Sequence, residues 1–247
     1  MRSRRPRHHR RTVRGGSDKA LWAVQGSGAR FGFPLKCGGG GGNLSSQKQM
    51  NSEVECIRRS VTVADRFRHQ GHPGGIVWLT GLPAAGKSTV AAELERQLFA
   101  LGKSVYVLDG DIVRRGLCAD LGFSPADRAE NIRRVAEVAA LFADAGIICI
   151  AALVSPLRRD RELARKLARE ALFVEVFVNA PVEICARRDP KGLYARAQAG
   201  EIREFTGVSA PYEPPKNPEI EIRTDQTSVS DEVASIRNYL LKHLAGC

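Results

Sequence analysis

The nine residues GLPAAGKST, at positions 81–89, decide the fold. They fit the pattern G-x-x-x-x-G-K-[S/T], in which glycines let the backbone curl so that several N–H groups converge on phosphate oxygens. In this pattern the lysine reaches the β- and γ-phosphates, and the following serine offers its hydroxyl to Mg²⁺. The stretch therefore predicts a nucleoside triphosphate site, with Ser88 as the metal ligand. The predicted nucleotide-binding residues are Gly81, Leu82, Pro83, Ala84, Ala85, Gly86, Lys87, Ser88 and Thr89.

The sequence around this loop alternates between strand-like and helix-like segments. An apolar, β-branched run precedes the loop, and a segment at helical spacing follows it. The strand-like runs are Ile76–Thr80, Val105–Leu108, Ile147–Leu153, Phe173–Val178 and Ile220–Arg223, and the helical ones are Ser88–Leu101, Asp127–Ala145, Arg159–Glu170 and Ser230–Leu244. Strands that are apolar on both faces and alternate with helices predict an α/β fold with a parallel sheet flanked by helices.

The net charge of +11 is concentrated at the start of the 247-residue chain. Residues 1–50 hold eight Arg, three Lys and a single acidic residue, are rich in Gly and lack hydrophobic periodicity. We expect a disordered basic tail over 1–50 and one globular domain over 51–247. The tail could be an organelle transit peptide, a nucleic-acid arm, a segment upstream of a true start at Met50, or a segment without function. We favour the last, so nucleic acid is not an expected partner.

The remaining composition favours a cytoplasmic protein. The six cysteines show no metal-ligand spacing, and no apolar run reaches the length of a membrane span. The N-terminus lacks the apolar region of a secretory signal. A plastid location is the alternative if the tail is a transit peptide.

The acidic pair Asp109 and Asp111 helps to decide between a GTPase, a motor and a small-molecule kinase. A GTPase would need an N-K-x-D motif, and a motor would want a longer chain with an acidic Walker B strand end; we find neither. The pair follows the strand-like run Val105–Leu108, at the sheet edge where ligands bind in such folds. Two carboxylates there could orient Mg²⁺ or accept the proton of an attacking hydroxyl, and either is equally suited to cap a helix. The pattern favours a kinase of small molecules.

Residues after this pair suggest what accepts the phosphoryl group. Arg114, Arg128 and Asn131 supply donors for an anionic acceptor with a polar ring edge. Phe123 stands in a polar stretch, where a core role explains it poorly and a stacking surface explains it well. These residues predict an acceptor that carries both a negative charge and a planar ring.

Two long blocks of the chain resemble one kinase family. DGDIVRRGLCADLGFSPADRAENIRRVAEVAALFADAG (109–146) and RDPKGLYARAQAGEIREFTGVSAPYEPP (188–215) are similar to the adenylyl-sulfate kinases. The resemblance implies a P-loop kinase with a mobile lid, usually dimeric. It also implies ATP-dependent phosphorylation of the 3′-hydroxyl of adenosine 5′-phosphosulfate (APS), giving 3′-phosphoadenosine 5′-phosphosulfate (PAPS) in sulfate assimilation. A homodimer, and a functional link to a sulfurylase, are the partners that it suggests.

The resemblance also assigns roles to residues. The block from 189 to 212 corresponds to the lid, and the catalytic set is Ser155, Asp111 and Lys87. The implied acceptor-binding residues are Asp111, Arg114, Phe123, Arg128, Asn131, Lys191 and Phe205, with the two phenylalanines sandwiching the adenine. The chain departs from the family pattern at Pro83-Ala84, Ile112 and Leu157.

Two questions stay open at this point. Ser155 matches a possible phosphoserine of the family, but no base lies near it in sequence, so we favour a hydrogen bond from its hydroxyl to substrate. The alternatives for the whole protein are another small-molecule P-loop kinase, for example of a sugar acid or nucleoside, and a regulatory nucleotide-binding module with a nucleic-acid arm.

Overall fold

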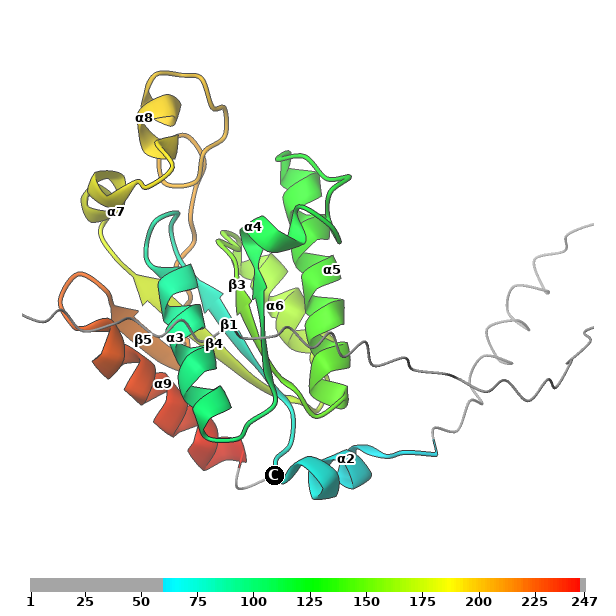
Figure 1. The fold of residues 1–247 in the computed structure, drawn as a ribbon. Coiled ribbons are helices and arrows are strands. Elements are labelled where there is room, and N and C mark those ends of the chain that lie inside the picture. Colours follow the sequence, from blue (N-terminus) through cyan, green and yellow to red (C-terminus); the bar gives the residue numbers. More distant parts are fainter. Residues whose placement is uncertain (1–59, 245–247) are drawn as a thin grey trace, which may run out of the picture. The chain divides into compact units, whose positions relative to one another are not determined.

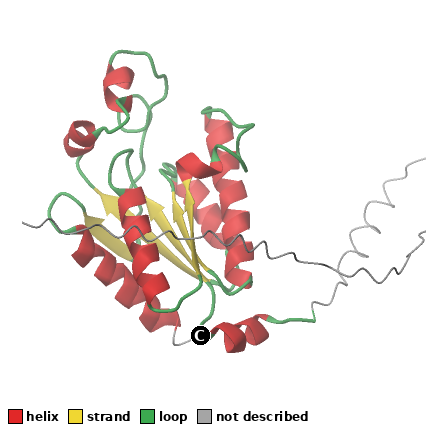
Figure 2. Ribbon diagram, in the orientation of Figure 1, coloured by secondary structure: helices red, strands yellow, loops and turns green. Residues whose placement is uncertain are grey.

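A five-stranded parallel sheet forms the centre of the domain (Figures 1 and 2). The structure is a computed structural model that describes residues 60–244. The strand order is β2-β3-β1-β4-β5, so the strand that precedes the phosphate-binding loop lies in the middle. The strands are β1 Gly75–Thr80, β2 Val105–Asp109, β3 Ile148–Ala152, β4 Leu172–Asn179 and β5 Ile220–Arg223.

Helices cover both faces of this sheet. In Figure 1, α3 and α9 lie on one face and α5 and α6 on the other, while α7 and α8 rise beyond the carboxyl ends of the strands. The helices are α2 Val63–Gln70, α3 Lys87–Ala100, α4 Gly110–Val113, α5 Pro125–Asp144, α6 Arg158–Leu167, α7 Val182–Arg188, α8 Leu193–Gln198 and α9 Val229–Leu244.

Alternation along the strands fills two cores. On β1, Val77 and Leu79 enter the cluster beneath α3 and α9, whereas Ile76 and Trp78 enter the cluster beneath α5 and α6. Successive side chains of a strand point to opposite faces, so a strand with apolar residues at every position must be buried on both. All six residues of β1 are buried, as its unbroken apolar sequence predicts.

The parallel α/β architecture predicted from the sequence is confirmed, and each of the five strands lies within two residues of its expected bounds. Helix α5 begins at Pro125 instead of Asp127, because Ser124 caps it with its hydroxyl and Pro125 suits the first turn. Within residues 60–244, no helix is long and apolar enough to cross a membrane. The predicted tail, residues 1–50, lies outside the described residues.

Candidate active site

The phosphate-binding loop, residues 81–89, connects β1 to α3. A Cβ atom on Gly81 would lie 2.4 Å from the carbonyl oxygen of Val178, so only glycine lets the loop leave the sheet here. Gly86 adopts φ +103° at the N-cap of α3, and no side chain caps this end of the helix. Free N–H groups and the helix dipole at an uncapped N-terminus favour a bound anion. The loop therefore has the backbone geometry that favours an anion such as phosphate.

The side chain of Lys87 is buried against its own loop. Its Nζ donates to the carbonyl oxygens of Gly81 at 3.0 Å and Leu82 at 2.7 Å. Burial lowers the pKa of Lys87 to about 8, against the opposing influence of neighbouring groups that include Asp109 and Asp111. A phosphate at this site would place a negative charge beside the buried ammonium group, whose two hydrogen-bond partners in the loop are neutral carbonyl oxygens.

Asp109 connects the loop to the acidic pair. The hydroxyl of Ser88 donates to Asp109 Oδ2 at 2.6 Å. The other carboxylate oxygen, Oδ1, accepts from the backbone N–H of Asp111 at 2.8 Å and thereby caps α4. Asp109 thus acts as a helix cap while presenting its second oxygen to Ser88.

Asp111 faces a residue from the predicted lid. Its carboxylate forms an ion pair with Lys191, from a segment 80 residues further along the chain. The side chains are 59% and 54% exposed, so solvent can reach the pair. A weakly held, solvent-accessible pair can separate at low cost when a substrate enters.

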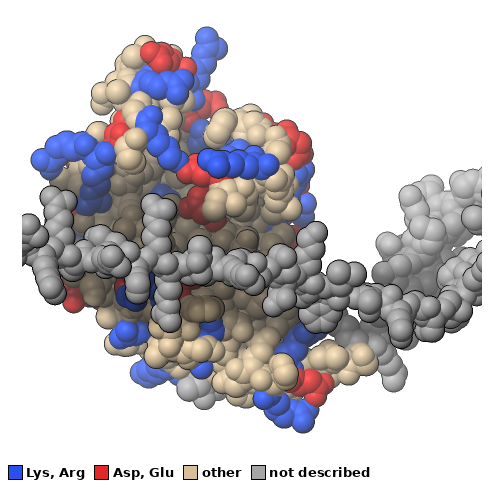
Figure 3. Space-filling model, viewed as in Figure 1, with Lys and Arg blue, Asp and Glu red and all other residues tan. Residues whose placement is uncertain are grey.

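Arg114 and Phe123 lie together near the start of α5. The guanidinium of Arg114 lies over the Phe123 ring at 4.4 Å from its centroid and donates to Gly122 O at 2.9 Å. The ring remains 66% exposed. An exposed ring under a cation is a surface on which a planar ligand can stack. Figure 3 shows Lys and Arg side chains gathered at this end of the domain, where α7, α8 and the start of α5 lie.

The guanidinium of Arg128 is occupied by protein oxygens. It donates to Phe123 O at 2.8 Å, to Thr206 Oγ1 at 2.9 Å and to Glu204 O. Arg128 therefore joins the start of α5 to the predicted lid. A contact with substrate would use its remaining donor capacity or require these bonds to rearrange.

Asn131 has the opposite character. It is 4% exposed, and its Nδ2 is buried without a hydrogen-bond partner. A buried amide without a partner costs about 1–3 kcal/mol. A polar ligand that accepted a hydrogen bond from this Nδ2 would remove that cost.

Phe205 is buried within the segment predicted as the lid, residues 189–212. It is 7% exposed and packs edge-to-face on Tyr194, with ring centroids 5.0 Å apart. The Tyr194 hydroxyl donates to Pro83 O at 3.0 Å, so the predicted lid contacts the phosphate-binding loop. A Cβ on Gly207 would lie 2.9 Å from Leu82, which marks a second close contact between lid and loop. The family resemblance implied that Phe205 and Phe123 pair around the adenine. In the structure Phe205 is buried, whereas Phe123 is exposed.

Ser155 follows β3 in a left-handed conformation, with φ +38°, and is 2% exposed. Its hydroxyl accepts a hydrogen bond from Trp78 Nε1 at 3.2 Å. Because this bond uses an oxygen lone pair, the hydroxyl proton remains free to donate. The geometry is compatible with the predicted hydrogen bond to substrate.

Thr224 contacts the phosphate-binding loop, although the sequence does not predict this contact. Its hydroxyl donates to Ala85 O at 2.8 Å, and Arg188 donates to that same hydroxyl at 3.0 Å. Thr224 therefore bonds directly to the phosphate-binding loop, and Arg188 holds Thr224 in place. No spacing or composition signals a contact over 139 residues.

The fold and the site define a P-loop kinase of small molecules. Residues 73–223 match the sequence profile of the family described as adenylylsulphate kinase. The chain belongs to the adenylylsulphate kinase family.

Individual relatives agree with this assignment. The adenylyl-sulfate kinase of Thermodesulfovibrio yellowstonii is 50% identical over 193 residues, covering 78% of this chain and 96% of the relative. That of Escherichia coli strain K12 / DH10B is 54% identical over 166 residues, covering 67% and 83%. A solved structure of the Mycobacterium tuberculosis APS kinase CysC in complex with AMPPNP and APS is 49% identical, with a TM-score of 0.67, covering 68% of this chain and 98% of that one.

Proposed function

We propose that this chain transfers the γ-phosphoryl group of ATP to the 3′-hydroxyl of APS, giving PAPS and ADP. The observation that carries the proposal is that Asp109 joins the two halves of the site. It accepts from Ser88 of the phosphate-binding loop and from the backbone of Asp111, the candidate group for the acceptor hydroxyl. Membership of the family supports it, and so does a structural relative that holds AMPPNP and APS.

In the proposed reaction the 3′-oxygen of APS attacks the γ-phosphorus in line, and the bond from that phosphorus to the β,γ-bridging oxygen breaks. Lys87 and the N–H groups of the loop stabilise charge on the phosphates. Asp111 orients the hydroxyl and takes its proton as the bond forms. Such loose transition states need alignment more than a strong base, so a carboxylate suffices. For this role Asp111 must release Lys191, which can then reach the anionic acceptor.

The residues present fit Mg²⁺, which binds to proteins through one or two oxygen ligands and completes its shell with water and substrate phosphates. Ser88 and Asp109 would hold it. Among residues 60–244 no three His, Cys, Asp or Glu side chains cluster as a metal site, so the nucleotide would supply further ligands. When bound, the ion neutralises charge on the β- and γ-phosphates.

The acceptor would lie between α5 and the lid, residues 189–212. Asn131 would satisfy its orphaned Nδ2 on the acceptor, and Arg114 and Lys191 would meet its anionic groups. The exposed ring of Phe123 offers one face for the adenine. Phe205 would need to turn from Tyr194 or contribute only the edge of its ring. We propose that the lid opens to admit APS and closes over it.

Wider assignments follow from the same activity. APS must come from a reaction that joins sulfate to adenylate, which is the link to a sulfurylase.

A homodimer is supported by an apolar groove of about 390 Å³ beside the edge strand β2, lined by Phe99 and Tyr106 among others. These two side chains are 73% and 52% exposed, and such a patch favours association. We place the protein in the cytoplasm and expect neither a membrane nor a nucleic acid as partner.

Calorimetric titration with APS tests the acceptor, in the presence and absence of AMPPNP with Mg²⁺. We expect APS to bind, and Asn131→Ala to weaken that binding more than the binding of AMPPNP. Preferred binding of a sugar acid or a nucleoside would favour another small-molecule kinase. Binding of nucleotide alone, with no acceptor, would favour a regulatory nucleotide-binding module.

A further inference from the structure

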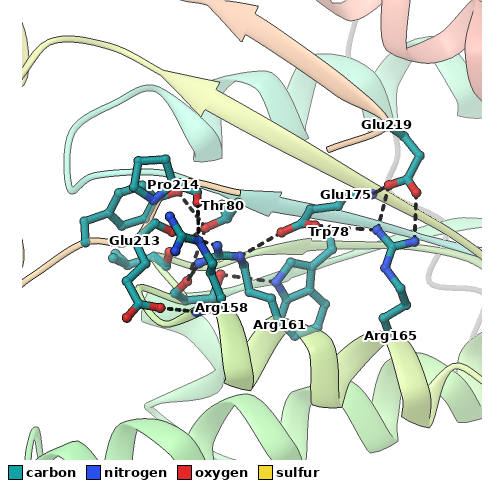
Figure 4. Close-up of polar contacts among 12 residues, drawn as sticks. Trp78, Thr80, Arg158, Arg161, Arg165, Glu175, Glu213, Pro214 and Glu219 are labelled. Atoms are coloured by element: carbon teal, nitrogen blue, oxygen red, sulfur yellow. Dashed lines mark hydrogen bonds and ion pairs between the residues drawn. The ribbon is translucent and has the colours of Figure 1, made fainter. Parts of the chain in front are cut away.

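A buried arginine on α6 connects two segments. One is the turn between β3 and α6, residues 153–157, which carries Ser155 and is called the Ser155 turn; the other is the segment that follows the lid. Arg161 is 3% exposed and makes three hydrogen bonds of 2.7 Å (Figure 4). Nε donates to Glu175 Oε1 on β4, Nη1 to the backbone oxygen of Ser155, and Nη2 to the backbone oxygen of Glu213. One rigid guanidinium plane therefore fixes the spacing of three segments that are distant in sequence.

Glu213 belongs to a short strap, residues 212–214, through which the chain leaves the lid. The backbone N–H of Glu213 donates to Pro156 O at 2.9 Å, and its carboxylate accepts from the N–H of Arg158 at 2.8 Å. Arg158 Nε donates to Pro214 O at 2.8 Å. The strap is thus bonded to the Ser155 turn, and Arg161 donates a hydrogen bond to each of the two segments.

The first strap residue, Tyr212, reaches the strand before the phosphate-binding loop. Its ring stacks on Phe177 with centroids 6.0 Å apart, and its hydroxyl lies 3.0 Å from Thr80 Oγ1. Thr80 is the last residue of β1 and donates to Val154 O at 2.8 Å. The strap, the Ser155 turn and the end of β1 form one connected unit at the carboxyl edge of the sheet.

Stability alone does not explain this arrangement. A buried ion pair such as Arg161–Glu175 often contributes less stability than well-packed apolar residues would. Ser155 also adopts a left-handed backbone conformation, which is strained for a residue other than glycine. The bond from Arg161 to the carbonyl oxygen of Ser155 holds that conformation in place.

We propose that Arg161 is a positioning residue for phosphoryl transfer. It locks the Ser155 turn and the strap into one unit, so that the lid closes about a fixed end and the Ser155 hydroxyl keeps its direction towards the acceptor. The inference rests on the proposed function, because it takes the roles of Ser155 and the lid from there.

The test compares Arg161→Met with a matched control, Arg165→Met. Arg165 lies one turn further along α6 and pairs with Glu219 at 2.8 Å and with Glu175 at 3.5 Å. Neither ion pair reaches the Ser155 turn or the strap. We expect Arg161→Met to lower kcat/KM for APS about 100-fold, as displacement of a positioned group does. KM for ATP should change less than about threefold, and Arg165→Met should change both parameters less than about threefold.

A second pair of variants keeps the test decisive if Arg161→Met folds poorly. Arg161→Met with Glu175→Gln removes both charges and leaves no unpaired buried carboxylate. Arg161→Met should also be combined with Ser155→Ala. We expect Ser155→Ala to cause little further loss in the Arg161 variant, because the direction of the Ser155 hydroxyl is already lost there together with the anchoring of the strap.

Additive losses would overturn the inference, and so would equal losses of activity in the Arg161 and Arg165 variants at equal melting temperatures. Unchanged kcat/KM for APS in Arg161→Met with an active wild type would also refute it while leaving the proposed function intact. A wild type that makes no PAPS would instead refute the proposed function.

Discussion

Lys87 is an ammonium group that the fold buries between two carbonyl oxygens of its own loop. Burial lowers its pKa to about 8, whereas bound phosphates favour the charged form and raise the pKa again. The protonated form therefore binds ATP more tightly. Binding should take up a proton at pH values just above 8, and ATP affinity should fall as the pH rises from about 8 towards the pKa of the complex.

The measurement is calorimetric titration of ATP just above pH 8 in two buffers with different enthalpies of ionisation. A difference in apparent enthalpy between the buffers would report the proton uptake. Lys87→Met is the control, and we expect it to bind ATP weakly and without proton uptake. Equal proton uptake by wild type and variant would contradict this role of Lys87.

Ser155→Ala tests direct transfer. Loss of one hydrogen bond to the acceptor should cost about 1 kcal/mol, which is a several-fold loss of kcat/KM for APS. The buried indole N–H of Trp78 would also lose its partner, so the free energy of unfolding should fall by about 1–3 kcal/mol. Incubation of the wild type with labelled ATP alone should leave Ser155 unlabelled. A label on Ser155 that passes into PAPS at the catalytic rate would show a covalent intermediate instead.

At the scale of elements, the sequence was most informative where the pattern is local. The strands were predictable because β1 and β3 are unbroken apolar runs. The phosphate-binding loop and the acidic pair were predictable because each depends on spacing within a few residues. Helix α2 also begins with a local signal, because Thr62 and Asp65 form a capping box at its first turn.

Other features depend on contacts that no local pattern encodes. The order of the strands follows from crossovers between them, and the short helices α7 and α8 lie in a segment interrupted by Pro and Gly. Arg161 reaches Glu213 over 52 residues, and Tyr194 reaches Pro83 over 111. Only the folded chain shows that these residues lie close together.

The contact between Tyr194 and Pro83 predicts how the lid responds to nucleotide. Burial raises the pKa of Tyr194, so its hydroxyl stays protonated and donates to the loop. Tyr194→Phe removes this bond and keeps the ring against Phe205. We expect KM for ATP to rise several-fold, in line with about 1 kcal/mol for one hydrogen bond, and tryptic cleavage within 189–212 to become faster. Unchanged cleavage and unchanged KM would mean that the contact does not hold the lid.

At the scale of the whole molecule, the predicted tail should be dispensable for chemistry. The basic charge of residues 1–50 is separate in sequence from the kinase residues, which begin with the loop at 81. We expect deletion of 1–50 to leave kcat, KM and the melting temperature unchanged. A large loss of stability in the shortened protein would show that this segment packs on the domain.

Association between copies belongs to the same scale. The exposed Phe99 and Tyr106 beside the groove at β2 should be covered in a homodimer. Light scattering of the full chain should then give twice the mass of 26.9 kDa. The mass of a single chain at micromolar concentration would contradict the dimer while leaving the proposed chemistry intact.

The most direct test of the proposed activity is identification of the product. The purified full chain is incubated with ATP, Mg²⁺ and APS, and the nucleotides are separated and characterised by phosphorus NMR. We predict one ADP for each PAPS, with the new phosphate on the 3′-oxygen, and no product with Lys87→Met. Absence of PAPS from a folded protein that binds ATP, or transfer to a sugar acid or nucleoside in preference to APS, would contradict the assignment.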